Sequence, residues 1–395
     1  MRILNTIGQV LTPEARAILE GVGCLDDRAL SQGELAEVIG EYDAALVGLG
    51  LTFDSRVLAR AEKLRVIATA TTGLDHIDLN AALVRDIEVL SLRGEEEFLN
   101  TITGTAELAF GMLIDLARRV PWAFESVRRY EWNREAFRGH SLSGKTLGIV
   151  GLGRLGRIMA RQAAGFGMRV IFFDPYVRAS SPRFFGKTPD VDRARGHAAF
   201  YAAASNGVED LLRNKASGVR GGQADEAEEE AEEGQTLLSQ CRGGSDPPRA
   251  GAFTAKAEKV DFDELLRESD AVSIHAHLTP ETEGMFGERE FALMKPSVYL
   301  INTSRGKIVN ERALLAALKQ NKIAGYATDV LADELSFESA GFSKHPLVEY
   351  AEMHENLLIV PHIGGMTVES REATDVFIAR KLAQYLRESL SLRAA

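Results

Sequence analysis

The chain has 395 residues, of which 45% are hydrophobic and 26% charged, and its net charge is -11 at pH 7. This composition is typical of a folded protein long enough for two domains, and the acid excess without a basic stripe excludes a nucleic-acid surface. No apolar run approaches the roughly 18–20 residues of a membrane helix, and the only cysteines, Cys24 and Cys241, exclude a disulfide framework and a Cys-x-x-Cys metal site. We therefore expect a cytoplasmic protein that binds no metal, nucleic acid or membrane.

The N-terminal region alternates short apolar runs with helical patterns. Strands are predicted at Arg2–Asn5, Ala44–Leu49 and Arg65–Thr69, with helices at Pro13–Glu20 and Gly33–Ile39 between them. Alternation of this kind predicts a small parallel α/β unit, and this unit carries no glycine motif of its own.

The third of these strands is followed by the loop TTGLDHID, residues 71–78. Gly73 permits a close approach of the backbone to a ligand, and Asp78 can cap a helix predicted from Leu79 to Arg85. A turn followed by a helix cap explains these residues without any ligand. From spacing alone, that interpretation is favoured over a ligand-binding loop.

A strongly helical pattern covers Thr105–Arg119, and we predict that Pro121 ends it. Because this helix directly precedes the next α/β region, it is a candidate bridge between two domains. The polar and aromatic residues from Trp122 to His140 are expected to connect it with the strand that follows.

The clearest motif is KTLGIVGLGRLGRIMARQAAGFGMRVIFFD, which ends at Asp174. A strand predicted at Thr146–Val150 leads into G-x-G-x-x-G, an amphipathic helix and a second strand. Gly151 permits the tight turn, Gly153 has no Cβ to block a pyrophosphate, and Gly156 lets the helix pack close to the sheet. The unpaired N–H groups and the dipole at the start of that helix attract phosphates.

Asp174 stands about 20 residues beyond the glycine motif, where a carboxylate accepts hydrogen bonds from a ribose diol and repels a 2′-phosphate. The motif therefore predicts NAD rather than NADP as the cofactor. The glycines alone could merely form a tight turn. The order of strand, turn, helix, strand and acid favours dinucleotide binding over that alternative.

The regular pattern breaks after Asp174. Residues 178–257 contain glycine clusters, a Pro-Pro pair and the acidic run DEAEEEAEE, and a connection of this length without structure is uncommon in a compact domain. We therefore predict a mostly disordered insertion at 178–257, in which the acidic run is a solvated segment rather than a metal site.

Alternating units return after the insertion and continue the parallel sheet of the nucleotide unit. The predicted elements are helices at Asp261–Glu268, Glu288–Met294 and Asn310–Gln320, strands at Ala271–Ile274, Val298–Asn302, Ala324–Thr328 and Leu357–Val360, and a final helix at Thr367–Leu390. The predicted fold class is α/β, with two Rossmann-like domains, doubly wound parallel sheets and a cleft between them. The predicted domains are 1–104 with 366–395, which binds substrate, and 105–365, which binds NAD.

Three polar residues follow strands of the second half of the chain: Arg305, Glu334 and His362. Ligands bind beyond the carboxyl ends of strands in open parallel sheets, so these side chains could converge on one cleft. An arginine presents a planar fork to a carboxylate, a histidine moves a proton near neutral pH, and a neighbouring carboxylate favours the protonated histidine. Beside a nicotinamide, this set suits the reduction of a 2-keto acid. Taken singly, each residue is more often a surface salt bridge or a strand-end cap.

Together, these motifs resemble those of the D-isomer-specific 2-hydroxyacid dehydrogenases. The matching stretches cover nearly the whole chain apart from the insertion: TTGLDHID, TAELAFGMLIDLARR, GKTLGIVGLGRLG, VDFDELLRESDAVSIH, LTPETEGMF, INTSRGKIVNERALLAAL and PHIGG. The resemblance implies an NAD-dependent oxidoreductase, homodimeric, that interconverts a D-2-hydroxy acid and its 2-keto acid. Glyoxylate or hydroxypyruvate and 3-phosphoglycerate are the candidate substrates.

By position, the resemblance assigns the catalytic roles to the strand-end residues. Arg305 looks like the arginine that binds the substrate carboxylate, His362 like the acid/base, and Glu334 like its partner. The implied cofactor-binding positions are Thr105, Gly151, Gly153, Arg154, Leu155, Gly156, Asp174, Thr303, Asp329 and Gly364. The implied substrate-binding positions are Thr71, Thr72, Gly73, Arg305 and His362. The family match thus reverses the ligand-free interpretation of the loop at 71–78.

Three departures from the family pattern and one alternative function accompany the resemblance. His277 stands where the family usually has Pro, Leu335 follows Glu334 where Pro is common, and the insertion at 178–257 is foreign to the pattern. Corepressors that resemble C-terminal-binding protein share the fold and the site, use NAD(H) to control assembly and recruit peptides. The alternative is therefore an NAD(H)-sensing interaction protein, with the acidic run as an interaction segment.

Overall fold

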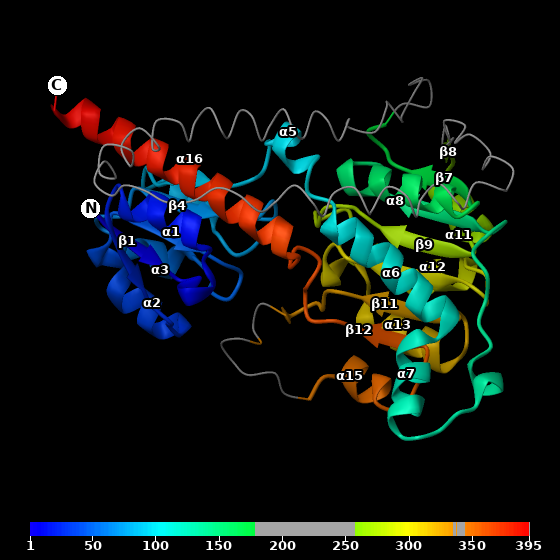
Figure 1. Cartoon of the computed structure of the whole chain (residues 1–395). Coiled ribbons are helices and arrows are strands. Elements are labelled where there is room, and N and C mark those ends of the chain that lie inside the picture. Colours follow the sequence, from blue (N-terminus) through cyan, green and yellow to red (C-terminus); the bar gives the residue numbers. More distant parts are fainter. Residues whose placement is uncertain (178–256, 335–336, 338–343, 395) are drawn as a thin grey trace, which may run out of the picture. The chain divides into compact units, whose positions relative to one another are not determined.

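The structure, a computed structural model, describes residues 1–177, 257–334, 337 and 344–394 (Figure 1). The described strands form two sheets, one of five strands and one of seven. Every strand pair within these sheets is parallel. Helices alternate with the strands along the chain, as parallel pairing requires, because the chain must cross back before each new strand. The predicted α/β class with two doubly wound parallel sheets is confirmed.

The first sheet has the strand order β2-β1-β3-β4-β5. Its strands are β1 (Arg2–Asn5), β2 (Cys24–Asp27), β3 (Ala44–Val47), β4 (Val66–Thr69) and β5 (Glu88–Leu90). The order reverses between β1 and β3, because the chain places β2 on one side of β1 and all later strands on the other. In open parallel sheets, ligands bind beyond the carboxyl ends of the strands at such a reversal.

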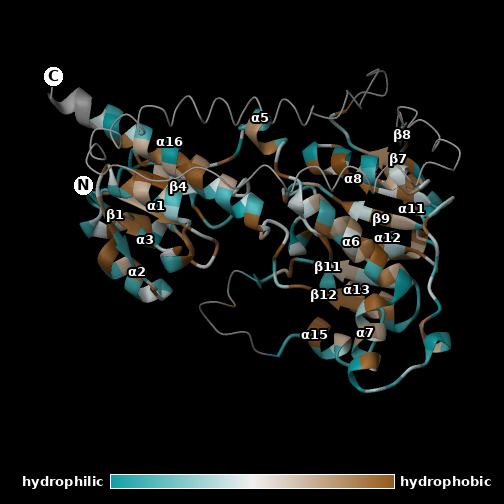
Figure 2. Cartoon of the chain, viewed as in Figure 1, coloured by the Kyte–Doolittle hydropathy of each residue, from teal (hydrophilic) through white to brown (hydrophobic). Residues whose placement is uncertain are grey.

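Helices cover both faces of the first sheet, because successive residues of each strand point to opposite faces. Ile3 packs in a buried cluster with residues of α1 and α16, whereas its neighbour Leu4 packs in another with residues of α2 and α3. The helices of this region are α1 (Pro13–Glu20), α2 (Gln32–Val38), α3 (Ser55–Ala59), α4 (Leu79–Leu83), α5 (Glu96–Leu99) and the C-terminal α16 (Val368–Ala394), with 3-10 turns η1 (Gly8–Val10) and η2 (Ile39–Glu41). Figure 2 shows hydrophobic and hydrophilic residues along α16, which packs against α1 and β4.

The second sheet has the strand order β12-β11-β10-β9-β6-β7-β8. Its strands are β6 (Thr146–Val150), β7 (Arg169–Phe173), β8 (Ala257–Lys259), β9 (Ala271–Ile274), β10 (Tyr299–Asn302), β11 (Gly325–Thr328) and β12 (Leu357–Ile359). The order reverses between β6 and β9. Since β6 leads into the glycine motif, that motif stands at the reversal of the sheet.

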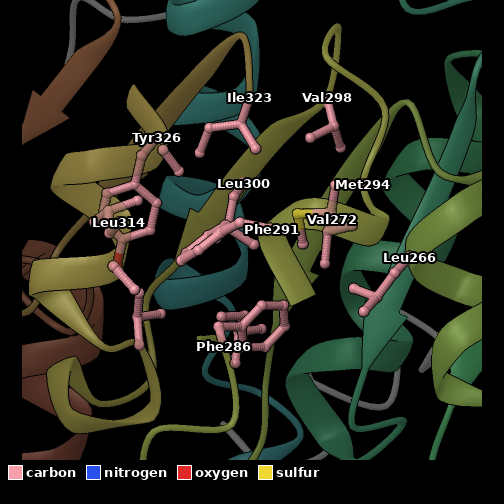
Figure 3. Close-up of a cluster of buried hydrophobic side chains, with 14 of the residues drawn as sticks. Leu266, Val272, Phe286, Phe291, Met294, Val298, Leu300, Leu314, Ile323 and Tyr326 are labelled. Atoms are coloured by element: carbon pink, nitrogen blue, oxygen red, sulfur yellow. The ribbon is translucent and has the colours of Figure 1, made fainter. Parts of the chain in front are cut away.

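Helices also cover both faces of the second sheet. On one face, α6 packs against α8 and contacts β10 and β11. On the other face, Figure 3 shows Phe286, Phe291, Leu300 and Tyr326 within one buried cluster. The helices of this region are α6 (Gly104–Arg118), α7 (Val120–Arg128), α8 (Arg154–Gly165), α11 (Phe262–Glu268), α12 (Glu288–Leu293), α13 (Glu311–Lys319) and α15 (Pro346–Ala351), with 3-10 turns η3 (Arg134–Phe137) and η4 (Gly306–Ile308).

The structure corrects the predicted end of the helix before the nucleotide unit. α6 ends at Arg118 because Arg119 adopts a left-handed backbone with φ 58°. Pro121 does not end this helix but lies in the first turn of α7, where its missing N–H needs no partner and its ring presets the helical φ. The segment from Trp122 to His140 therefore begins as helix rather than as a connection.

Three edge strands, β2, β5 and β8, were not predicted. Each is short and carries charged residues, which weaken the apolar pattern of a strand. Because Ala257 begins β8, the predicted insertion ends one residue too late. The rest of the insertion, residues 178–256, lies outside the described residues.

The division into 1–104 with 366–395 and 105–365 stays a prediction. Among the helices that the structure describes, none is both long and apolar enough to cross a membrane. The described residues also contain no group of three or more His, Cys, Asp or Glu side chains that could hold a metal ion.

Candidate active site

A cavity of about 420 Å³ lies at the carboxyl ends of strands from both sheets. Ile7 and Leu49, which follow β1 and β3, line it together with Arg154 and His275, which follow β6 and β9. These are the strands at which the two sheets reverse their order. The cavity therefore stands where open parallel sheets bind their ligands.

The glycine turn after β6 depends on the absence of side chains. Gly151 has φ +92°, and a Cβ there would lie 2.7 Å from the carbonyl oxygen of His275. A Cβ on Gly156 would lie 2.2 Å from the carbonyl oxygen of Gly151, so only glycine lets α8 start this close to β6. At Gly153, by contrast, the space that a Cβ would take is open. The turn thus leaves room in front of the first N–H groups of α8, which attract anions.

Asp174 follows β7 and is 9% exposed. Its Oδ2 accepts the N–H of Leu152 at 2.8 Å, and its Oδ1 accepts the N–H of Tyr176 at 2.9 Å. The first bond fixes the carboxylate beside the glycine turn. Each carboxylate oxygen keeps a further lone pair, so the group can still accept a hydrogen bond from a ligand hydroxyl.

Four of the predicted cofactor-binding residues, Thr105, Thr303, Asp329 and Gly364, line the cavity together. The Asp329 carboxylate accepts the N–H groups of Ile363 at 2.6 Å and Gly364 at 2.8 Å. Burial raises the pKa of Asp329 to about 6, against the opposing effect of these two bonds. The hydroxyl of Thr303 is buried and has no hydrogen-bond partner within the described structure, which leaves it available to a ligand.

Arg154 and Leu155 begin α8 and line the same cavity. Arg154 donates from Nη1 to the carbonyl oxygens of Leu99, at 2.9 Å, and Ile102. Burial lowers the pKa of this guanidinium. The segment before α6 therefore holds the side chain, and a contact of Arg154 with the cofactor stays a prediction.

His362 follows β12, and its Nδ1 lies 2.9 Å from Oε1 of Glu334. The other oxygen of Glu334 accepts the N–H of Leu331 at 3.1 Å, which fixes the carboxylate. The backbone of His362 is left-handed, with φ 53°, and its N–H donates to the carbonyl oxygen of Asp329 at 2.9 Å. Such backbone strain in a bulky residue is uncommon and clusters at functional sites. The predicted pair is within hydrogen-bond distance, and Nε2 remains for a substrate.

The pKa of His362 is raised above its ordinary value of 6.5. Burial lowers this pKa, but the hydrogen bond and charge of Glu334, together with the charge of Asp329, outweigh burial and the opposing charge of Arg305. The shift therefore favours the protonated imidazole, the form that a proton donor requires.

Arg305 follows β10 and lines both this cavity and a second one of about 470 Å³, which His362 also lines. Its Nε donates to Oδ2 of Asp75 at 2.7 Å, and its Nη1 donates to the carbonyl oxygen of Ser304 at 2.8 Å. Burial raises the pKa of Asp75, but the hydrogen bond and charge of Arg305 lower it overall. Arg305 and His362 thus line the same two cavities.

The loop at 71–78 brings the predicted substrate-side residues Thr71, Thr72 and Gly73 to the cavity. Thr71 donates from its hydroxyl to the carbonyl oxygen of Gly73 at 2.7 Å, which closes a tight turn. Asp78 caps α4 by accepting the N–H of Ala81 at 2.9 Å, as predicted. The same loop therefore caps α4 and lines the cavity.

The sequence-based prediction gave no role to Asp75, although it lies inside the quoted TTGLDHID motif. The structure places its carboxylate against the guanidinium of Arg305. No spacing in the sequence signals this contact, because the two residues lie 230 positions apart.

Comparison with known proteins identifies relatives over most of the chain. The family model described as "D-isomer specific 2-hydroxyacid dehydrogenase, NAD binding domain" matches residues 110–195 and 244–364, more than half of the chain. A glyoxylate reductase of Thermococcus litoralis is 33% identical over 91% of this chain and 85% of its own length. A D-3-phosphoglycerate dehydrogenase of Methanocaldococcus jannaschii is 30% identical over 96% of this chain, which spans only 57% of that relative.

Solved structures show the same fold. A D-lactate dehydrogenase from Aquifex aeolicus, complexed with NAD and lactic acid, has a TM-score of 0.71 at 22% identity and covers 99% of this chain and 97% of its own. A glyoxylate reductase from Paecilomyes thermophila has a TM-score of 0.67 at 23% identity and covers 98% of this chain and 96% of its own. The family match confirms the predicted resemblance and NAD as the cofactor.

The place of Asp174 beside the glycine turn predicts its effect on cofactor choice. Replacing Asp174 with Ala should lower the ratio of kcat/KM for NADH to kcat/KM for NADPH by about tenfold or more, because a charge-assisted hydrogen bond to the ribose is lost. Asp174→Asn, which keeps an acceptor for the N–H of Leu152 but no charge, should mainly improve the use of NADPH. Equal use of both cofactors by the unaltered protein would contradict the assignment.

Proposed function

Because the chain belongs to the NAD-dependent D-isomer-specific 2-hydroxyacid dehydrogenase family, we propose that His362, Glu334 and Arg305 perform the interconversion of a small D-2-hydroxy acid and its 2-keto acid. The observation that carries this proposal is the pair of His362 and Glu334 at 2.9 Å, in which His362 lines the same cavity as Arg305. An acid/base with its partner carboxylate and a carboxylate-binding fork are the protein groups that this reaction needs.

The described residues fit the cofactor. The open space at Gly153 before the N-terminus of α8 suits a pyrophosphate, and the fixed carboxylate of Asp174 suits a ribose. The unpaired hydroxyl of Thr303 and the carboxylate of Asp329 would hold the nicotinamide end. When bound in its reduced form, the cofactor supplies the hydride for reduction.

Arg305 and the loop at 71–73 hold the substrate in this proposal. Arg305 binds the carboxylate of the 2-keto acid through paired N–H groups. The backbone of Thr72 and Gly73 lines the cavity beside this guanidinium, which packs against Gly73 because that residue has no side chain. Together they place the keto oxygen toward His362, which lines the same cavity.

His362 moves the proton. In reduction, its protonated imidazole donates from Nε2 to the keto oxygen as the carbonyl carbon is reduced, while Nδ1–H stays bonded to Glu334. Glu334 keeps the ring in this orientation and stabilises its positive charge. In oxidation, the neutral ring removes the hydroxyl proton.

The candidate substrates are glyoxylate or hydroxypyruvate on one side and 3-phosphoglycerate, with its 2-keto product, on the other. Steady-state oxidation of NADH with a panel of these 2-keto acids tests the proposal. Turnover of one of them supports it. Tight NADH binding without turnover of any would overturn it and favour the alternative, an NAD(H)-sensing interaction protein.

We also propose a homodimer, on the exposed apolar face of α7. Val120, Phe124 and Val127 lie at helical spacing and are 45%, 61% and 51% exposed. Light scattering should give about twice the chain mass of 43.1 kDa, and Phe124→Glu, which places a charge on this face, should give the single-chain mass. A single-chain mass for the unaltered protein would overturn the proposal.

His362→Asn provides the sharpest test of the proton transfer. Asparagine tolerates the left-handed backbone at this position but cannot donate a proton as imidazolium does, so the fold is kept while the chemistry is lost. General acid catalysis contributes about 10²–10⁴ in rate, and kcat for reduction should fall by that factor. NADH binding, measured by fluorescence titration, should stay near native. Near-native kcat would show that another group supplies the proton.

Glu334→Gln should shift the pH profile of reduction. The folded pKa of His362 lies above its ordinary value, so the protonated form and the activity are present below that pKa and lost as pH rises through it. Without the negative charge of Glu334 the pKa falls, and the alkaline limit of kcat/KM for reduction should move to lower pH. An unchanged alkaline limit would contradict the coupling of these two side chains.

A further inference from the structure

The loop at 71–78 holds the guanidinium of Arg305 on two sides. Asp75 accepts the N–H of Nε at 2.7 Å. Gly73 lies so close that a Cβ on it would stand 1.5 Å from Nη2 and 2.7 Å from Cζ. The guanidinium therefore occupies the space that a side chain at position 73 would fill, and Asp75 fixes it there.

The main chain of Arg305 is held separately from its side chain. The amide of Asn302 donates to the carbonyl oxygen of Arg305 at 3.0 Å, and Oδ1 of Asn302 accepts the N–H of Ser304 at 3.0 Å. Nη1 of Arg305 donates to the carbonyl oxygen of Ser304 at 2.8 Å. The arginine is thus fixed at its base by its own strand end and at its tip by the loop at 71–78.

The contacts leave one edge of the guanidinium for a ligand. A guanidinium has five N–H groups, of which Nε carries one and each Nη carries two. It can bind a carboxylate in two parallel bonds along the Nε/Nη2 edge or along the Nη1/Nη2 edge. Asp75 takes the Nε–H, which closes the first edge, and the bond to Ser304 uses only one N–H of Nη1.

We propose that Asp75 is a positioning residue that selects the Nη1/Nη2 edge of Arg305 as the edge that binds the carboxylate of the 2-keto acid. This inference rests on the proposed function. It assigns to Asp75 a geometric role, since a carboxylate that merely neutralised Arg305 would weaken, and not improve, the attraction for an anionic substrate.

The substitutions at position 75 separate geometry from charge. Asp75→Asn keeps an oxygen acceptor for Nε but removes the charge, whereas Asp75→Ala removes both. If Asp75 acts by positioning the guanidinium, Asp75→Ala lowers kcat/KM for the 2-keto acid by about tenfold or more, which is the usual effect of losing a hydrogen bond to a charged group. Asp75→Asn keeps kcat/KM within about threefold of native. The dissociation constant of NADH is unchanged in both variants.

A second readout reports the bidentate contact itself. The unaltered chain should prefer a 2-keto acid strongly over the matching 2-keto amide, because only the carboxylate offers two equivalent oxygens to the fork. In Asp75→Ala this preference should fall by about tenfold, and in Asp75→Asn it should be kept. The probe is the 2-keto acid of the panel that the unaltered chain reduces fastest, with its amide.

Asp78→Ala is the matched control, because it removes a helix cap from the same loop without contact to Arg305. It should lower thermal stability and leave the preference for the acid unchanged. Should Asp75→Ala fail to fold, Asp75→Glu, which moves the carboxylate by one methylene, takes its place, and the preference should again fall.

Each outcome decides the inference. A native preference in Asp75→Ala or Asp75→Glu overturns it, and so does an equal loss in Asp75→Asn and Asp75→Ala, which would show that charge alone acts. If the unaltered chain reduces no 2-keto acid, the proposed function fails together with the inference. Turnover that is insensitive to Asp75 overturns the inference alone.

Discussion

The buried carboxylate of Asp329 determines the geometry of the candidate site. Asp329 follows β11, and its carboxylate accepts the N–H groups of Ile363 and Gly364, while its main-chain carbonyl oxygen accepts the N–H of His362. These three bonds impose the left-handed backbone on His362, a conformation that a free chain would avoid at roughly 1–3 kcal/mol. The imidazole lies toward Glu334, so a hydrogen-bonded strand end holds the residue that we propose as the proton donor.

A second constraint is the close approach of backbone to backbone at the reversal of the second sheet. Gly151 and Gly156 have no room for a side chain, and the main chain of His275 is one of the groups that fills this space. Beyond the carboxyl ends of β6 and β9, Gly153 stands before the first turn of α8 and faces open space. The same packing that closes the sheet therefore leaves the anion-binding end of a helix uncovered.

Most of the fold was predictable because its interior strands are continuous apolar runs between helical patterns, as parallel sheets require. The edge strand β2, with the sequence CLDD, was missed because half of its residues are acidic, and such a pattern is typical of a loop. The break at Arg119 was missed because a left-handed residue other than glycine has no reliable sequence signal. Pro121 does not settle the boundary, because a proline can follow the end of one helix or stand in the first turn of the next. The pair of His362 and Glu334 followed from strand ends, whereas the partnership of Arg305 with Asp75 joins residues far apart in sequence whose contact no pattern indicates.

The placement of α16 bears on how the protein is made. Its residues Ile378, Leu382 and Leu386 complete a buried cluster whose other members, such as Ile3 and Leu46, belong to the first sheet. Along the chain, α16 follows every described strand, so during synthesis the ribosome releases it after all of them. The part of this apolar face that α16 covers, beside α1, therefore stays exposed while the second sheet is translated, and exposed apolar surface of this kind favours aggregation of a nascent chain.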